Sequence, residues 1–115
     1  MEITAVTTWQ GTPAAIKFLV EAAKGAAEIH ESLGASNPRF MRPVSGDQGV
    51  AHYSVDFESV ESYGAFTDAV RKHEWWSQTE QAVADAYPDL EMKGTMIYYN
   101  TLDSVSYTHL RAHET

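Results

Sequence analysis

Arg42 and His52 are the first residues in this sequence whose types and spacing suggest chemistry. They flank a turn-like segment, 45–49, and a hairpin that pairs Val44 with Val50 would bring both side chains to one face of a sheet. In a semi-apolar cavity, an arginine and a histidine can hold a carboxylate or an enolate, and the histidine can move a proton. We therefore predict Arg42 and His52 as catalytic residues. The plainer interpretation is an ion pair at a rim for Arg42 and simple packing for His52, and a register shift of one residue would separate them.

Further side chains are candidates for lining a ligand cavity, because they place polar groups and aromatic rings near the same sheet. We predict five such residues: Ser54, Asp56, Trp75, Trp76 and Tyr98. The two tryptophans can equally anchor a helix bend against the sheet. His30 lies at the edge of a helical apolar stripe, which is typical of a half-buried histidine with a satisfied hydrogen bond. His73 beside Glu74 has no further ligand at helical spacing, so we expect no metal, and we expect no cofactor.

The stretch 50–70 must position most of these side chains. Residues 50–57 alternate between apolar and mixed positions, which predicts a strand with one apolar face. From Val60 onward the apolar residues recur every three or four positions, as in an amphipathic helix, and Ser59 suits the N-cap. A strand that runs directly into a helix indicates that the helix folds back over the apolar face of the strand.

The remaining elements follow from the same periodicities. Thr12 can cap a helix, Pro13 suits its first position, and Gly34 ends it. Pro43 cannot donate to a strand ladder, so the second strand should lie at an edge. We predict strands at 2–10, 38–45, 50–57 and 91–100, and helices at 13–33, 59–72 and 77–87, with a bend at 72–76.

This order predicts an α+β, ferredoxin-like βαββαβ fold, in which a four-stranded antiparallel sheet carries its helices on one face. The strand order is then 4-1-3-2. The other face of the sheet would be too apolar for water and too polar for an ordinary core. We therefore expect a homodimer whose sheets face each other around a cavity.

Composition limits the partners. The chain has 115 residues, a formal net charge of −8 and no cysteine, which predicts one domain over residues 1–104. The negative charge and the scattered basic residues argue against binding to nucleic acid or to an anionic membrane. No apolar run is long enough to span a membrane. The absence of cysteine fits a cytoplasmic protein.

Residues 105–115, VSYTHLRAHET, match one reading frame of a common transposon-based sequencing adaptor. We interpret this tail as a non-native assembly artefact of a metagenomic gene and leave it out of the fold and site assignments.

Over residues 1–103 the sequence resembles the dimeric α/β-barrel superfamily, which includes antibiotic-biosynthesis monooxygenases, stress-responsive barrel proteins and the NIPSNAP family. The resemblance rests on the element order, on the run from Val55 to Ser59 that enters the second helix, and on Glu74-Trp75 after that helix. Glu74-Trp75 is similar to an aspartate-proline-glutamate-tryptophan stretch of NIPSNAP-like proteins, with Lys72-His73 in place of the first two residues.

The resemblance implies a small-molecule-binding homodimer, with two function classes open. One is a cofactor-free monooxygenase or isomerase acting on an apolar or aromatic acid. The other is a non-catalytic homodimer with a structural or binding role. Haem degradation would imply an asparagine on the first strand, and none is present there.

Overall fold

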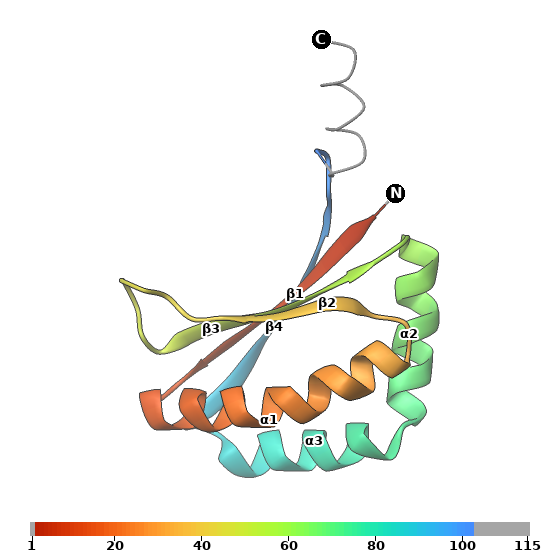
Figure 1. The fold of residues 1–115 in the computed structure, drawn as a ribbon. Coiled ribbons are helices and arrows are strands. Elements are labelled where there is room, and N and C mark those ends of the chain that lie inside the picture. The colour runs from red at the N-terminus through yellow and green to blue at the C-terminus, as the bar shows by residue number, and fades with distance from the viewer. Residues whose placement is uncertain (1, 103–115) are drawn as a thin grey trace, which may run out of the picture.

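The computed structural model describes residues 2–102, so the predicted tail at 105–115 lies outside the described residues. It shows a four-stranded antiparallel sheet with three helices on one face (Figure 1). The elements, in chain order, are β1 (Ile3–Gly11), α1 (Pro13–Ser32), β2 (Ser36–Met41), β3 (Val50–Phe57), α2 (Val60–Lys72), α3 (Glu74–Ala86) and β4 (Leu90–Tyr99). No helix among residues 2–102 is long and apolar enough to cross a membrane.

The strand order is β2-β3-β1-β4, which confirms the predicted ferredoxin-like topology with the second strand at an edge. β1 lies in the middle and pairs antiparallel with both β3 and β4. Ile3 of β1 lies between Phe57 and Tyr99, and Ala5 lies between Val55 and Ile97. Directly paired residues share a face of the sheet, so this register separates a helix side from an open side.

The helix boundaries follow the predicted caps. Thr12 is the N-cap of α1, where its hydroxyl accepts a hydrogen bond from the Ala15 amide at 3.1 Å. Ser59 caps α2 through the Ser62 amide at 3.1 Å. Beyond α1, Gly34 has a φ of +108°, a conformation that glycine adopts without strain.

The predicted bend between the second and third helical segments is a complete break at His73. This residue has extended backbone angles and ends α2. Its Nδ1 atom accepts a hydrogen bond from the Trp75 amide at 3.0 Å, so the same residue also caps α3. The break places Trp75 and Trp76 in the first turn of α3.

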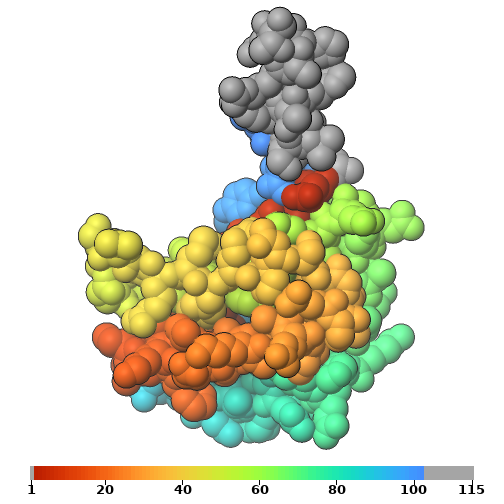
Figure 2. All heavy atoms as spheres, in the orientation of Figure 1, coloured from red at the N-terminus to blue at the C-terminus, as the bar shows by residue number. Residues whose placement is uncertain are grey.

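The second strand differs from the prediction. β2 ends at Met41 instead of continuing to residue 45, and Met41 pairs with His52. The register shifts between Ser36 and Arg39, and Asn37 has a positive φ of 50° within this irregular stretch. The periodic pattern of apolar residues in the sequence predicts neither the register shift nor the positive φ. Residues 42–49 therefore form a connection at one edge of the molecule (Figure 2).

The helix side of the sheet holds the core in two clusters. One cluster is built on Ile3, Ala5, Ala35, Val55 and Phe57. The other is built on Trp9, Ile16, Ala51 and Leu90. Alternate residues of β1 and β3 supply six of these nine residues, as a period of two requires.

Candidate ligand cavity

A cavity of about 580 Å³ lies between the helix side of the sheet and helices α2 and α3. We call it the main cavity. The sheet lines it with Ala5, Thr7, Trp9, Tyr53, Val55, Met92 and Thr95. The helices line it with His30, Tyr63, Phe66, Thr67, Val70, Arg71, Trp75, Trp76, Thr79, Glu80, Val83 and Ala84. Its volume falls in the range of small-molecule sites.

The local structure explains why these side chains meet. Thr7 and Trp9 project from β1 at a period of two, and Tyr53 lies opposite Thr7 on β3. Tyr63 and Phe66 lie three residues apart on α2 and pack against Phe57. Both are half-buried, because the main cavity takes the place of further packing on that side of α2.

A histidine–tyrosine pair supplies the polar part of the wall. The Nδ1 atom of His30, near the end of α1, lies 2.8 Å from the Tyr53 hydroxyl and forms a hydrogen bond with it. The imidazole also meets Trp75 edge to face, with ring centroids 4.8 Å apart, and Phe66 at 5.5 Å. These three neighbours hold the ring in one orientation.

Burial sets the protonation of this pair. Desolvation lowers the pKa of His30 from 6.5 to about 4, so the imidazole is neutral at neutral pH. Burial, followed by the negative charge of Glu31, raises the pKa of Tyr53 to about 12. At neutral pH the imidazole of His30 and the phenol of Tyr53 are therefore both uncharged, and the pair offers hydrogen-bonding groups without net charge.

The other polar groups of the main cavity are few. Arg71 and Glu80 carry opposite charges, and four threonine hydroxyls complete the polar lining: Thr7, Thr67, Thr79 and Thr95. Most of the remaining wall is aromatic or aliphatic. Such a wall can hold a flat apolar molecule and orient it through one or two hydrogen bonds.

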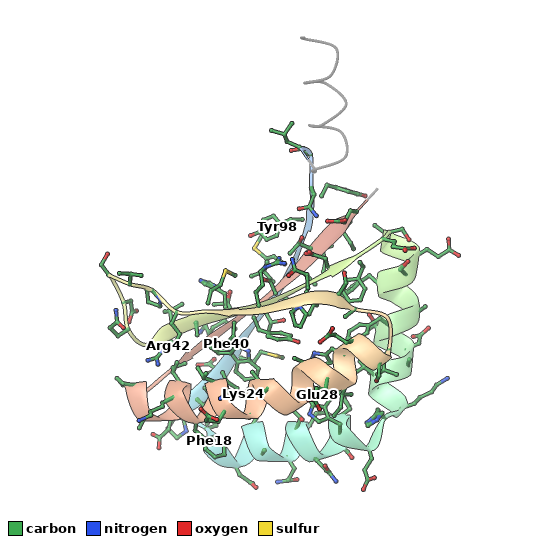
Figure 3. All side chains as sticks on the ribbon, in the orientation of Figure 1. Phe18, Lys24, Glu28, Phe40, Arg42 and Tyr98 are labelled. Atoms are coloured by element: carbon green, nitrogen blue, oxygen red, sulfur yellow. The ribbon has the colours of Figure 1, made fainter. Side chains whose placement is uncertain are left out.

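The predicted site residues divide between the two faces of the sheet. Trp75 and Trp76 lie in the wall of the main cavity, and their role in binding a ligand stays a prediction. Tyr98 lies on the open side (Figure 3), in the register position opposite Thr4. Arg42 lies exposed in the connection beyond β2, so the predicted pairing that would bring it opposite His52 is wrong. No described structural feature joins Arg42 to the main cavity.

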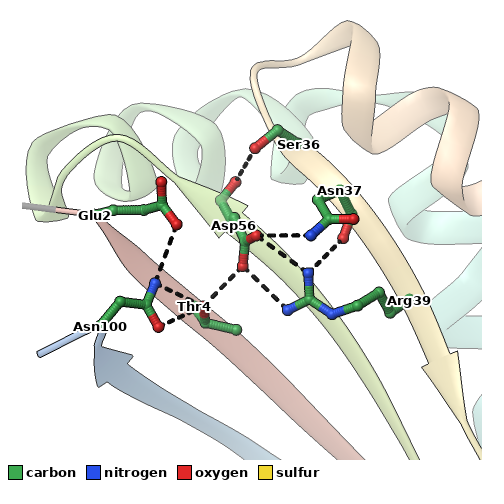
Figure 4. Close-up of polar contacts among 7 residues, drawn as sticks. All are labelled: Glu2, Thr4, Ser36, Asn37, Arg39, Asp56 and Asn100. Atoms are coloured by element: carbon green, nitrogen blue, oxygen red, sulfur yellow. Dashed lines mark hydrogen bonds and ion pairs between the residues drawn. The ribbon is translucent and has the colours of Figure 1, made fainter. Parts of the chain in front are cut away.

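Asp56, predicted as a ligand-binding residue, is held by its neighbours on the open side (Figure 4). The guanidinium of Arg39 donates to both carboxylate oxygens at 3.1 Å. Thr4 donates at 2.7 Å and Asn37 at 3.1 Å. Burial disfavours the charged form of Asp56, but these hydrogen bonds outweigh it and hold the pKa of the carboxyl below its usual value. Its role in binding a ligand stays a prediction.

His52 and Ser54 also lie on the open side. The Nδ1 atom of His52 is hydrogen-bonded to the Thr8 hydroxyl at 2.9 Å. The Ser54 side chain is buried, and its oxygen has no hydrogen-bond partner among the described residues. A catalytic role for His52 and a binding role for Ser54 stay predictions, because the structure joins neither residue to the main cavity.

The sequence interpretation missed the importance of His30 and Tyr53. His30 was expected to be half-buried and satisfied, and its hydrogen bond to Tyr53 agrees with that, but it also lines the main cavity. Both residues interrupt apolar faces, His30 on the first helix and Tyr53 on the third strand. That interruption is the signal that the sequence offers.

The element order and the sheet order define the fold as ferredoxin-like, and similar solved structures share this fold. A dimeric ferredoxin-like protein from an uncultured marine organism aligns with a TM-score of 0.70 and 10% identity over 89% of this chain and 97% of that one. Rv0793 from Mycobacterium tuberculosis aligns with a TM-score of 0.64 and 9% identity over 90% and 99%. A variant of MhuD with two manganese protoporphyrin IX molecules per active site aligns with a TM-score of 0.58 and 17% identity over 90% and 97%.

These identities show a shared fold and nothing narrower. No model of a known protein family matches the sequence, and no curated protein does.

Proposed function

We propose that this protein binds a flat, largely apolar small molecule, such as an aromatic acid or a related ring compound, in the main cavity. The observation that carries the proposal is the cavity of about 580 Å³ with a neutral His30–Tyr53 pair in an aromatic wall. The ring faces supply contact area, and the pair supplies orientation through hydrogen bonds.

The charges of the lining favour a ligand with little net charge in its ring system. His30 is neutral, and Arg71 and Glu80 balance each other. A carboxylate group on the ligand would find its cation at Arg71, on the side of the cavity formed by the end of α2. Desolvating a charge elsewhere in this wall would be costly.

Calorimetric titration with 2-naphthol and 2-naphthoate tests the proposal. Thr67 faces the main cavity and the next residue, Asp68, is exposed outside it, so the two positions form a matched pair on α2. We expect Thr67→Trp to weaken binding at least about tenfold, because the indole occupies the ligand volume, and Asp68→Trp to leave it unchanged. If neither compound binds at about 1 mM, the proposal is contradicted.

A second candidate function is isomerisation of an enolisable substrate, and the hydrogen-bonded His30 in the cavity wall favours it. His30 would accept a proton from the carbon beside a carbonyl group and return it to another carbon of the enolate. A cofactor-free oxygenase would begin with the same proton transfer, before its electron-rich anion reacts with O₂. A pKa of about 4 makes His30 a weak base, so binding is the primary proposal.

Deuterium exchange distinguishes catalysis from binding alone. With 2-tetralone in D₂O as the probe, nuclear magnetic resonance follows exchange beside the carbonyl. We expect exchange above the buffer rate for the native protein and none for His30→Gln. Equal rates in both proteins would leave binding as the function.

We also propose that the protein is a homodimer whose open sheet sides face each other. Three large apolar side chains stand on or beside this side with much of their surface exposed: Met41 at 43%, Met96 at 62% and Tyr98 at 46%. A second copy would cover this surface without using the helices.

A further inference from the structure

A second, smaller space lies between α1 and α3. Its volume is about 180 Å³, and we call it the tail groove. The helices line it with Phe18, Leu19, Ala22, Ala23, Ala26, His30, Trp75, Thr79, Ala82, Val83 and Ala86, and the sheet and its edge contribute Trp9, Phe40, Tyr53 and Leu90.

The sequence of the two helices explains why this space exists. Ala22 and Ala26 lie one turn apart on α1, and Ala82 and Ala86 lie one turn apart on α3. Methyl groups this short do not reach across between the helices, so a channel with alanine walls remains between them.

The tail groove adjoins the main cavity. Six residues line both spaces: Trp9, His30, Tyr53, Trp75, Thr79 and Val83. The edge-to-face contact of His30 with Trp75 lies at this shared wall. A ligand seated against the His30–Tyr53 pair would therefore lie beside the tail groove.

The two spaces differ in chemistry. The main cavity contains Arg71, Glu80 and four threonine hydroxyls, whereas the groove beyond the shared wall is lined by alanine, leucine and phenylalanine side chains. That part offers no hydrogen-bonding side chain. Polar groups of a ligand would lose their water there without replacement, and methylene groups would gain from leaving water.

We propose that the tail groove binds the unbranched alkyl tail of the ligand whose ring occupies the main cavity. This rests on the proposed function and narrows it to an amphiphile with a planar head and an aliphatic chain. The groove has room for about six groups of the size of a methylene or a water molecule.

A series of 4-alkylphenols from 4-ethylphenol to 4-hexylphenol tests this by calorimetric titration. Each added methylene that enters the groove should tighten binding about fourfold. If the affinity of the native protein does not increase from 4-ethylphenol to 4-hexylphenol, the inference is overturned and the proposed function stays intact. Failure of every phenol to bind contradicts the proposed function itself.

Filling the groove supplies the second arm. Ala26 lines the tail groove but not the main cavity. Ala14 lies exposed on the same helix and lines neither space. We expect Ala26→Leu to weaken the binding of 4-hexylphenol at least about tenfold. The affinity for 4-ethylphenol should change by less than about twofold. Ala14→Leu should change neither.

Binding of 4-ethylphenol by Ala26→Leu reports that the variant is folded with its main cavity intact. An unchanged chain-length series in that variant places the tail elsewhere and overturns the inference. If Ala26→Leu does not fold, Ala22→Leu at the more exposed side of the groove replaces it with the same expected results.

Discussion

His30 keeps a neutral imidazole at neutral pH because burial among Tyr53, Phe66 and Trp75 disfavours its charged form. Its folded-state pKa of about 4 lies below the ordinary value of 6.5. The unfolded chain therefore binds this proton more readily than the folded chain between these two values. The folded state is fully stabilised above pH 6.5 and loses stability as the pH falls toward 4.

We accordingly predict that the free energy of unfolding falls by up to about 3 kcal/mol between pH 6.5 and pH 4. Urea denaturation at a series of pH values measures it. In His30→Gln this part of the fall should disappear, since glutamine does not titrate. A native profile that is flat over this window would show that His30 is not desolvated.

The Arg39–Asp56 pair gives a second prediction, in a lower pH range. The folded-state pKa of Asp56 is lowered, so its stabilisation is present above its ordinary pKa near 3.8 and is lost as the pH falls below that value. Arg39→Met removes two of the hydrogen bonds to the carboxylate and should cost about 1–3 kcal/mol at pH 7. Thermal unfolding measures the loss. A cost equally large at pH 2 would contradict its electrostatic origin.

At the scale of the elements, the start of α1 packs tightly against the loop before β4. The Gly11 amide donates to the Gly49 carbonyl at 2.8 Å, and the Thr12 amide donates to the Asp89 carbonyl at 2.9 Å. A Cβ atom on Gly11 would collide with the Asp89 carbonyl oxygen, which is backbone and cannot move alone. Glycine is needed here for space, because the end of β1 meets the segments that precede β3 and β4 at this point.

We predict that Gly11→Ala lowers the free energy of unfolding by about 1–3 kcal/mol, as overpacking does. Gly64 is the control, since it lies within α2 and an added Cβ there meets nothing within 4 Å. Gly64→Ala should stabilise the protein by about 0.5–1 kcal/mol, because alanine is the better helix former. Chemical denaturation compares the two, and a neutral Gly11→Ala would refute the close contact.

At the scale of the whole molecule, all three helices cover one side of the sheet and leave the other open (Figure 1). Met96 and Tyr98 of β4 stand on the open side, in register with Val6 and Thr4 of β1. A stable contact between two such surfaces should bury at least about 1,200 Å² in total. The main cavity, on the helix side of the sheet, would then remain open to a ligand in each protomer.

We predict that the native protein runs as a dimer in light scattering behind a sizing column, and that Met96→Glu runs as a monomer. A charge at that position would be buried against its copy without a partner. Glu28→Lys, at an exposed position of α1 on the other side of the sheet, is the control and should remain dimeric. A native monomer at tens of micromolar would contradict the facing-sheet arrangement.

Local chemistry made the fold predictable from the sequence. The period of two in 50–57, the caps at Thr12 and Ser59, and the stop at Gly34 act within a few residues, and all appear as expected. The element order and the right-handed crossover rule restrict the sheet to a few topologies. The observed ferredoxin-like strand order is one of them. The interruption of the helix at 72–76 was also expected, and it falls at His73.

The place of the cavity was decided by tertiary structure alone. The sequence placed candidate chemistry on the open side, around Arg42 and His52, but β2 ends one residue before Arg42 and pairs Met41 with His52. That register depends on the irregular stretch at Asn37, which has no periodic signal. His30 and Tyr53 are 23 residues apart, and only packing of α1 across β3 brings their side chains within 2.8 Å. Contacts between distant segments, and the space that they leave unfilled, are properties of the folded chain.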